Sequence, residues 1–300
     1  MQGRNLRLQN PFLLLLPHSC RQTHNHSLHL NTIAFNSNSE ITKYVTNATK
    51  YWNNFYKRHQ NKFFKDRRYL QKDWSYYLSN DNSHSNQQKV VLEIGCGAGN
   101  TIFPLVAAFP NLFVHACDFS PHAIALVKAH EDFRADRVNA FVADVTVDDL
   151  DETVLRDSVD VVTLIFTLSA VCPSKMPFVL QNIRKVLKPN GHVLLRDYAI
   201  GDFAQVKLLE KNQLISENFY VRGDGTCAFY FSKDFLSTLF EMNGFSIMEL
   251  SVYSREIENR SRKIVMDRRW IRGVFCKPHN LQPTLVPKPD DSLFPGSKSG

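Results

Sequence analysis

A glycine-rich segment flanked by acidic residues carries the residue types best suited to chemistry. The stretch Lys89–Asn100 reads KVVLEIGCGAGN, in which an apolar run leads through Glu93 into Gly95, Gly97 and Gly99. Glycines between a strand and a helix let backbone N–H groups approach a ligand closely. A dinucleotide-binding loop has the spacing G-x-G-x-x-G, whereas the spacing here is G-x-G-x-G. This favours a nucleoside ligand without phosphates, such as S-adenosylmethionine, and a plain structural turn is the alternative.

Polar residues recur where later apolar runs end. Asp118 closes the run FVHACD, about 20 residues after the glycines, where a carboxylate can accept hydrogen bonds from the ribose hydroxyls of a nucleoside. Asp144 and Asp197 stand at the ends of two further runs, and the apolar Ile165 stands at the end of a third. The carboxyl ends of parallel strands meet at one edge of a sheet, and ligands bind there. The sequence therefore predicts that these residues and Glu93 surround one cofactor site.

The apolar runs alternate with helical segments, which predicts an α/β fold with a doubly wound, mostly parallel sheet over residues 88–278. The expected strands are 90–94, 113–118, 138–144, 159–166 and 192–195, with closing strands at 245–252 and 269–275. Ser120 and Pro121 predict the start of one helix, and Ser232 the N-cap of another. A helix over 175–187 is expected to stop at the Pro-Asn-Gly sequence 189–191.

Residues 40–80 form a separate extension in which aromatic and basic residues are interleaved. Trp52, Phe55, Tyr56 and His59 have the i, i+3, i+4, i+7 spacing of one helix face. This face could pack on the main domain as ordinary core. It could also close as a lid over a sulfonium ligand by cation–π attraction, with neighbouring Lys and Arg side chains binding phosphates.

Composition limits the remaining functions. The formal net charge of +7 suits a polyanionic partner or an ordinary solvated basic surface. The six cysteines are scattered and the histidines lack metal-ligand spacing, so we expect neither a disulfide framework nor a bound metal. No apolar run is long enough to span a membrane. Residues 1–39 contain no Asp or Glu, which predicts either a mitochondrial or plastid transit segment or a disordered tail of a cytoplasmic or nuclear protein. A second disordered tail is expected over 279–300.

Several segments together resemble one known family. They are WNNFYKRHQNKFFKDR, EIGCGAGN, ACDFSPHAI, IFTLSAVCPSKM, LQNIRKVLKPNG, LLRDY, ENFYVRGDGT and NRSRKIVMDRRW. From about Lys50 to Pro278 the chain is similar to the methyltransferase-like enzymes that make N3-methylcytidine in tRNA. The FFKDR and FYVRGDGT segments are not general methyltransferase motifs, so the resemblance is specific. One departure is Ala199, where glycine is expected after Arg-Asp-Tyr.

The resemblance implies a class I (Rossmann-like) methyltransferase fold that uses S-adenosylmethionine. It implies that Trp52 and Tyr56 cover the cofactor, with the methionine part held by the loop of Gly95 and Gly97. By the same resemblance Asp118 would bind the ribose, Asp144 the adenine amine, and Ile165 would line the pocket. Family members modify a cytidine at the 5′ edge of the anticodon loop of serine, threonine or arginine tRNAs. Some of them need a helper such as seryl-tRNA synthetase.

The chemistry can also be derived from the base. The N3 atom of cytosine is engaged in Watson–Crick pairs, so a modified base must be unstacked and inserted into a pocket. The N3 lone pair is itself the nucleophile, and a carboxylate near the base would stabilise the positive charge that methylation creates. Asp197, at a strand end, is the candidate for this catalytic role, with a salt bridge or a loop cap as the alternative.

The expected RNA contacts are basic and aromatic residues outside the glycine loop: Lys65, Arg67, Arg196, Tyr198, Phe219, Tyr220, Arg222 and Arg269. The aromatic residues before Arg222 could stack on the flipped base, or could simply pack beside a turn. Two other functions remain open from the sequence. One is a methyltransferase that acts on a small molecule or a protein, and the other is a tRNA-binding subunit with this fold but without turnover.

Overall fold

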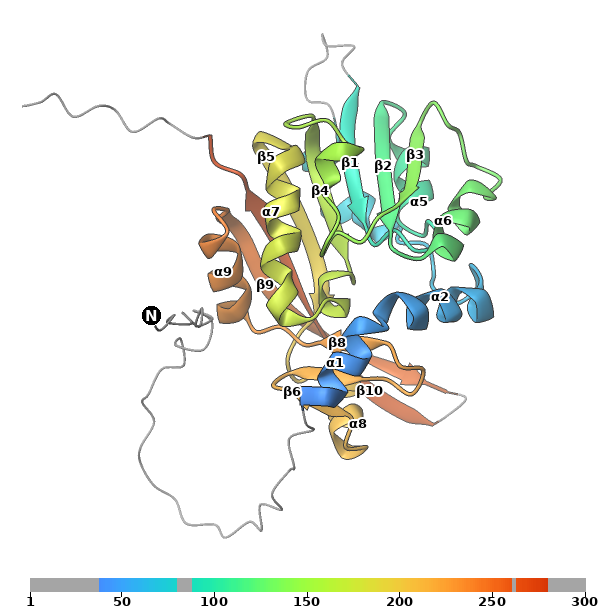
Figure 1. Ribbon diagram of the computed structural model, residues 1–300, viewed down its shortest axis with the longest axis vertical. Coiled ribbons are helices and arrows are strands. Elements are labelled where there is room, and N and C mark those ends of the chain that lie inside the picture. Colours follow the sequence, from blue (N-terminus) through green and yellow to red (C-terminus); the bar gives the residue numbers. More distant parts are fainter. Residues whose placement is uncertain (1–37, 80–87, 261–262, 280–300) are drawn as a thin grey trace, which may run out of the picture. The chain divides into compact units, whose positions relative to one another are not determined.

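A seven-stranded sheet forms the centre of the fold. The computed structural model describes residues 38–79, 88–260 and 263–279 (Figure 1). The helices are α1 (Asn38–Thr46), α2 (Ala48–His59), α3 (Tyr69–Asp73), α4 (Ser75–Leu78), α5 (Ile102–Ala108), α6 (Pro121–Lys128), α7 (Met176–Val186), α8 (Phe203–Glu210) and α9 (Lys233–Met242). The strands are β1 (Lys89–Ile94), β2 (Leu112–Asp118), β3 (Val138–Val142), β4 (Val159–Ile165), β5 (Leu187–Tyr198), β6 (Leu214–Ser216), β7 (Phe219–Val221), β8 (Cys227–Phe229), β9 (Ser246–Asn259) and β10 (Ile264–Cys276).

The strand order in this sheet is β3-β2-β1-β4-β5-β10-β9. Neighbouring strands from β3 to β5 are parallel, and β10 runs antiparallel to both β5 and β9. In the register, Ile94 pairs with Cys117 of β2 and with Leu164 of β4. The carboxyl ends of the central strands therefore lie level, which confirms the predicted mostly parallel α/β sheet and collects its strand-end residues at one edge.

Both faces of the central strands are buried, as their continuous apolar runs require. Successive residues point to opposite faces, so Leu92 joins a core that includes Ile183 of α7 and Leu236 of α9. Its neighbour Val91 joins a second core that includes Ile124 of α6. The sheet is thus a middle layer between two layers of helices.

The predicted helix caps are confirmed. The Ser120 hydroxyl accepts a hydrogen bond from Ala123 N–H at the start of α6, and the Ser232 hydroxyl accepts one from Phe235 N–H at the start of α9. The predicted helix over 175–187 is confirmed to within one residue at each end, since α7 spans Met176–Val186. The predicted start of the following strand at 192 was wrong, because β5 begins at Leu187. The Pro-Asn-Gly sequence lies inside β5 at a register shift, where Asn190 takes a left-handed φ of 62°.

The segment between β5 and α9 contains elements that the sequence did not predict. Helix α8 is followed by a small antiparallel sheet of order β6-β7-β8. The two closing strands are longer than expected and pair with each other beyond the end of β5. Short strands of three residues give too little alternation for a sequence pattern to detect.

The described part of the N-terminal extension contains the helices α1 to α4, with turns and irregular backbone over residues 60–68. The predicted aromatic face lies on α2. Helix α3 contributes Leu70 to the core that also contains Val91. The expectations for residues 1–37 and 280–300 lie outside the described residues. None of the described helices is long and apolar enough to span a membrane.

Candidate cofactor and substrate site

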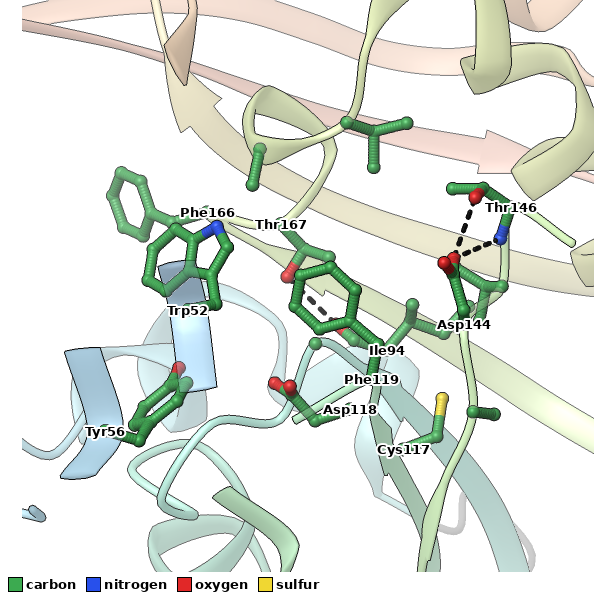
Figure 2. A pocket seen from close by; sticks show the side chains of 15 residues that line it. Trp52, Tyr56, Ile94, Cys117, Asp118, Phe119, Asp144, Thr146, Phe166 and Thr167 are labelled. Atoms are coloured by element: carbon green, nitrogen blue, oxygen red, sulfur yellow. Dashed lines mark hydrogen bonds between the residues drawn. The ribbon is translucent and has the colours of Figure 1, made fainter. Parts of the chain in front are cut away.

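Two hollows meet at the carboxyl edge of the parallel strands. The first hollow is lined by strand-end residues that include Ile94, Asp118 and Asp144 (Figure 2). The second hollow is lined by residues that include Glu93, Tyr198 and Arg222. The hollows contain about 560 and 890 Å³ of empty space, counting the part open to solvent. They share five lining residues: Trp52, Tyr56, Gly95, Phe166 and Ala170.

Asp118 lies at the end of β2 and organises the glycine loop. One carboxylate oxygen accepts a hydrogen bond from Gly97 N–H at 3.1 Å, and the other accepts one from Ser120 N–H at 2.9 Å. The side chain is 5% exposed, and burial raises the pKa of Asp118 to about 6 although both hydrogen bonds act to lower it. A carboxylate oxygen can accept more than one hydrogen bond, so Asp118 keeps acceptor capacity for ribose hydroxyls.

The glycine loop has the backbone conformation that its residues suggested. Gly95 and Gly97 have φ angles of 68° and 54°, in the left-handed region that glycine adopts without strain. A Cβ atom on Gly97 would lie 2.6 Å from the hydroxyl oxygen of Tyr56. The loop and the extension are therefore in direct contact at this point, with no space for a larger residue.

The α2 helix lies against the entrance to the cofactor edge. Trp52 and Tyr56 line both hollows, and their rings stack with centroids 6.0 Å apart. Asn53 ties this helix to α6, because its side-chain oxygen accepts hydrogen bonds from the Ser120 hydroxyl at 2.8 Å and from His122 N–H at 3.2 Å. Trp52 and Tyr56 thus lie beside both hollows (Figure 2), and both also pack in a small apolar cluster with Phe55 and Ala123. Their role as a lid stays a prediction.

The remaining predicted cofactor residues also reach the site. Asp144 lines the first hollow in a turn after β3, and its carboxylate accepts hydrogen bonds from the N–H and hydroxyl of Thr146 at 3.0 and 2.7 Å. Ile165 and Glu93 line the second hollow. Glu93 is 2% exposed and accepts a hydrogen bond from the Thr163 hydroxyl, and burial raises the pKa of Glu93 to about 7.

Aromatic and cationic side chains line the second hollow. The Arg67 guanidinium carbon lies 4.8 Å from the centroid of the Phe166 ring, and that of Arg222 lies 5.7 Å from the Tyr198 ring. The Phe166 and Tyr198 rings are 5.0 Å apart. Of the predicted RNA contacts, Arg67, Tyr198 and Arg222 therefore come together in one place.

Phe166 is a site residue that the sequence analysis missed. It follows β4 directly and has a φ of 56°, which is rare for a bulky side chain. Its N–H donates to the carbonyl of Arg196 at 2.8 Å, which holds the backbone in this conformation. Its aromatic type at a strand end was the only available signal, because a left-handed conformation leaves no mark in the sequence.

Asp197 lies behind the wall of the second hollow. Its side chain is fully buried, and its two oxygens accept hydrogen bonds from Ser169 N–H and from its own neighbour Tyr198 N–H, both at 2.9 Å. Burial raises the pKa of Asp197 to about 6. Ser169 is the residue of this group that lines the hollow. These contacts give Asp197 the role of positioning Ser169, and its catalytic role stays a prediction.

Three other predicted RNA contacts lie outside the two hollows. Arg196 packs on the Tyr69 ring at 3.9 Å and pairs with Asp73 at 3.2 Å, so it joins α3 to β5. Arg269 lies next to Gly201, and Lys65 is exposed. A contact with RNA remains a prediction for these three residues.

Phe219 and Tyr220 require a correction, because the structure buries both side chains. They are 1% and 4% exposed and alternate along β7 between two apolar clusters. The Tyr220 hydroxyl also receives a hydrogen bond from the side chain of Gln205. Neither ring can stack on a base without unpacking β7, so the alternative that they pack beside the turn is correct.

Two further observations concern the chemistry of the site. The described residues contain no group of His, Cys, Asp and Glu that could hold a metal ion. Cys96 lines the second hollow, but burial raises the pKa of its thiol well above the ordinary value, so it packs as a neutral thiol. Ala199 has an ordinary φ and forms an isolated β-bridge with Phe231, so the backbone does not need the glycine expected there.

Comparison with known proteins identifies the family. A family model described as a methyltransferase domain matches residues 92–193. The chain is 43% identical to human tRNA N(3)-cytidine methyltransferase METTL6 over 240 residues, which is 80% of this chain and 84% of that protein. It is 37% identical to tRNA N(3)-methylcytidine methyltransferase trm141 of Schizosaccharomyces pombe, covering 79% of this chain and 95% of that protein.

A solved structure agrees on the fold. The SAM-dependent methyltransferase from Anabaena variabilis superposes with a TM-score of 0.57 at 15% identity, covering 76% of this chain and 94% of that chain. At this identity the likeness concerns the fold alone. The identity to METTL6 and trm141, over 84% and 95% of their lengths, shows more: the chain belongs to the family of tRNA N(3)-cytidine methyltransferases.

Proposed function

We propose that this protein transfers the methyl group of S-adenosylmethionine to N3 of a cytidine in tRNA. The observation that carries the proposal is the meeting of the two hollows under Trp52 and Tyr56. The first hollow has the acidic and apolar lining that a nucleoside needs. The second has the aromatic and cationic lining that a flipped nucleotide needs. A methyl donor in the first hollow therefore adjoins an acceptor in the second.

The residues of the first hollow fit S-adenosylmethionine. Asp118 is held by two backbone N–H groups and keeps acceptor capacity for two hydroxyls. Ile94, Ala143 and Val145 offer an apolar surface for a purine. The ring of Trp52 offers a face that attracts a cationic sulfonium. When bound, S-adenosylmethionine supplies an electrophilic methyl group that a neutral nitrogen can accept.

The protein's part in the reaction is positioning. The N3 lone pair of cytosine is available at neutral pH, so no general base has to activate it. The enzyme must hold the nitrogen in line with the methyl carbon at close approach, which can lower a barrier by several kcal/mol. Gly97 against Tyr56 and Phe166 against Tyr198 fix the walls on either side of this junction.

Positive charge on the exposed surface of the N-terminal extension suits a polynucleotide. The segment 50–72 carries the exposed cations Lys50, Lys57, Arg58, Lys62, Lys65, Arg68 and Lys72. The nearby described acids are Asp66 and Asp73, of which Asp66 pairs with Arg68 and Asp73 with Arg196. A basic stretch of this kind binds phosphates without regard to sequence and makes affinity depend on salt. A small-molecule substrate would have no use for it.

The direct test uses labelled cofactor. The protein is incubated with methyl-labelled S-adenosylmethionine and total tRNA, and the nucleosides are then separated and identified. We expect the label in N3-methylcytidine, and its yield should fall as salt is raised. Label in another nucleoside, in protein, or in a small molecule in the absence of RNA would refute the proposal. Binding of tRNA and cofactor without transfer would identify a non-catalytic subunit.

Finer features are also proposed. The resemblance of the ENFYVRGDGT and FFKDR segments supports a target at the 5′ edge of the anticodon loop of serine, threonine or arginine tRNAs. It also supports a helper such as seryl-tRNA synthetase. Transfer rates on individual tRNA transcripts, each with and without the synthetase, will separate these possibilities. A rate unchanged by the synthetase on every transcript would remove the helper from the proposal.

The site of action in the cell is proposed from the acid-free residues 1–39. Such a segment supports import into mitochondria or plastids. A fusion of residues 1–39 to a fluorescent protein should then co-localise with one of these organelles. A diffuse cytoplasmic or nuclear signal would refute the import.

A further inference from the structure

Three carboxyl groups surround the second hollow, and they differ in what they can still bind. They belong to Glu93, Asp197 and Asp224. If the protein methylates cytosine, as proposed above, one of them is suited to reading the base. The distinction rests on how deeply each carboxyl group is buried and on which of its oxygen atoms already accept hydrogen bonds from the protein.

Asp197 and Glu93 are engaged within the protein. Both oxygens of Asp197 accept backbone N–H groups, and its side chain is fully buried. Glu93 is 2% exposed beneath the glycine loop and holds the Thr163 hydroxyl. Breaking either arrangement would leave buried polar groups unpaired, which costs about 1–3 kcal/mol per group.

Asp224 lines the hollow and has an oxygen to spare. Its Oδ1 atom accepts hydrogen bonds from the N–H of Thr226 at 3.0 Å and from the Thr226 hydroxyl at 2.7 Å. Among the described residues, nothing donates a hydrogen bond to its second oxygen, Oδ2. The side chain is partly exposed, so a ligand can reach it.

The turn that carries Asp224 is fixed before any substrate arrives. Arg222 N–H donates to the carbonyl of Thr226 at 2.7 Å, and Gly225 N–H donates to the carbonyl of Arg222 at 2.9 Å. Gly225 has a φ of 85°, and a Cβ atom there would lie 2.3 Å from the ring of Tyr51 on α2. The turn is therefore held by its own hydrogen bonds and by contact of Gly225 with Tyr51 of the extension.

Cytosine and uracil present different hydrogen-bonding groups to a carboxylate such as that of Asp224. Cytosine carries an exocyclic amino group that donates hydrogen bonds, whereas uracil carries a carbonyl oxygen at the same position. An ionised carboxylate accepts only, and a guanidinium donates only. A carboxylate beside the amino group therefore accepts cytosine and repels uracil. The neighbouring guanidinium of Arg222 is suited to the O2 atom, which both bases share.

We propose that Asp224 reads the exocyclic amino group of the target cytosine and stabilises the positive charge that the base acquires. The N3 lone pair forms the new nitrogen–carbon bond as the electrons of the carbon–sulfur bond pass to sulfur. One unit of positive charge thus moves from the sulfonium to the pyrimidine ring, and no proton has to leave. Asp224 acts twice, first as a hydrogen-bond acceptor and then as the counter-charge.

The test measures base preference in binding, apart from turnover. The full chain, saturated with S-adenosylhomocysteine so that no transfer occurs, is titrated with two tRNA hairpins. These differ only in carrying cytidine or uridine at the position that the wild-type protein methylates. We expect the wild type to bind the cytidine hairpin at least tenfold more tightly. In Asp224→Asn, whose amide can donate to uracil, the preference should fall below twofold or reverse.

Control variants keep the test decisive. Asp136→Asn removes an exposed carboxylate between α6 and β3 and should leave the preference unchanged. Asp224→Ala removes the reading group altogether and should bind both hairpins alike, so misfolding of the amide variant would not leave the question open. S-adenosylhomocysteine affinity and thermal melting check that each variant is folded.

The outcomes separate the two proposals. A wild-type protein that transfers no methyl group to cytidine refutes the proposed function. A wild type that methylates cytidine, with folded Asp224 variants that keep the full preference for the cytidine hairpin, refutes only the role of Asp224. In Asp224→Asn the turnover number should also fall at least tenfold, while the KM for S-adenosylmethionine stays within twofold of wild type.

Discussion

Two turns with the same local hydrogen bonds line the two different hollows of the site. In the turn Asp144–Thr146 one carboxylate oxygen accepts the N–H and hydroxyl of the threonine at 3.0 and 2.7 Å, and in the turn Asp224–Thr226 the distances are the same. The first turn lines the first hollow and the second lines the second hollow. The Asp-x-Thr turn thus fixes the position of its carboxylate by two hydrogen bonds. It does not determine which ligand the carboxylate binds.

The surroundings of the two turns account for their different functions. Asp144 stands beside the apolar Ala143 and Val145 and opposite Asp118 across the first hollow (Figure 2). Asp224 shares its hollow with the cationic Arg67 and Arg222. An apolar surrounding suits a nucleoside, and a cationic one suits a nucleotide within RNA. The predictions below test this division.

Substitution of the middle residue of the second turn should have the largest effect on methyl transfer to tRNA. The first turn has Val145, whereas the second has Gly225 at a φ of 85° and in contact with the ring of Tyr51. Gly225→Ala should cost about 1–2 kcal/mol from the left-handed backbone alone, plus the displacement of the ring. We expect the rate of transfer to tRNA to fall about thirtyfold, as measured by label incorporation.

Gly223 supplies the matched control for this variant. It lies in the same loop, but a Cβ atom added there would meet nothing within 4 Å beyond its chain neighbours, and its φ is not left-handed. Gly223→Ala should therefore retain the wild-type rate within about twofold. Equal losses in the two alanine variants would contradict the idea that the second turn is pressed against the extension.

Asp118 should make the binding of S-adenosylmethionine in the first hollow depend on pH. Burial raises the pKa of Asp118 to about 6, and only the ionised carboxylate accepts hydrogen bonds with both oxygens. Affinity for S-adenosylmethionine should therefore weaken as pH falls below about 6, approaching tenfold per pH unit. In Asp118→Asn we expect weak binding that lacks this dependence. Calorimetric titration between pH 5 and 8 measures both, and a flat wild-type profile would rule out this role.

The raised pKa of Asp118 also makes the unfolding free energy of the protein depend on pH. The folded carboxyl has a pKa of about 6 and the unfolded one about 3.8, so between these values the folded protein binds a proton that the unfolded chain has lost. The contribution of Asp118 to the unfolding free energy therefore falls as pH rises through this window, by up to about 3 kcal/mol. Denaturant titration of Asp118→Asn beside wild type at pH 4 and 7 tests the difference.

The threonines of the two turns give the smallest effects. Thr146→Val and Thr226→Val each remove one hydrogen bond to a carboxylate, which contributes about 1.5–3 kcal/mol when the acceptor is charged and less when it is partly exposed. Both variants should lower the unfolding free energy by about 1 kcal/mol, as followed by denaturant titration. A much larger loss in one of them would show that the turns are less alike than their distances indicate.

Much of this site could be predicted because its residues are adjacent to strand ends in the sequence. Gly95 and Asp118 follow apolar runs, and parallel strands bring such ends together whatever the side chains are. Trp52 and Tyr56 were recognisable from their helical spacing. The predicted start of the strand at 192 was wrong because β5 already begins at Leu187 and accommodates the Pro-Asn-Gly sequence at a register shift.

Other features of the site depend on tertiary packing, which cannot be predicted from the neighbouring residues in the sequence. Phe219 and Tyr220 have the composition of a stacking platform, but β7 buries one side chain on each of its faces. Asp197 lies near the end of β5 and Asp224 in the loop between β7 and β8. Their burial and their occupied oxygen atoms distinguish them, and neither is visible in the sequence. The left-handed conformation of Phe166 depends on the adjoining strand β5, through the carbonyl of Arg196.

The central claim is that the two matched turns serve different ligands, and one measurement addresses it directly. The affinity for S-adenosylmethionine and the cytidine-over-uridine binding preference are measured side by side in Asp144→Asn and Asp224→Asn. We predict that Asp144→Asn weakens cofactor binding about tenfold and keeps the base preference. In Asp224→Asn the cofactor affinity should be kept and the base preference lost. Variants that both lose cofactor affinity, or that both keep the base preference, would contradict the account.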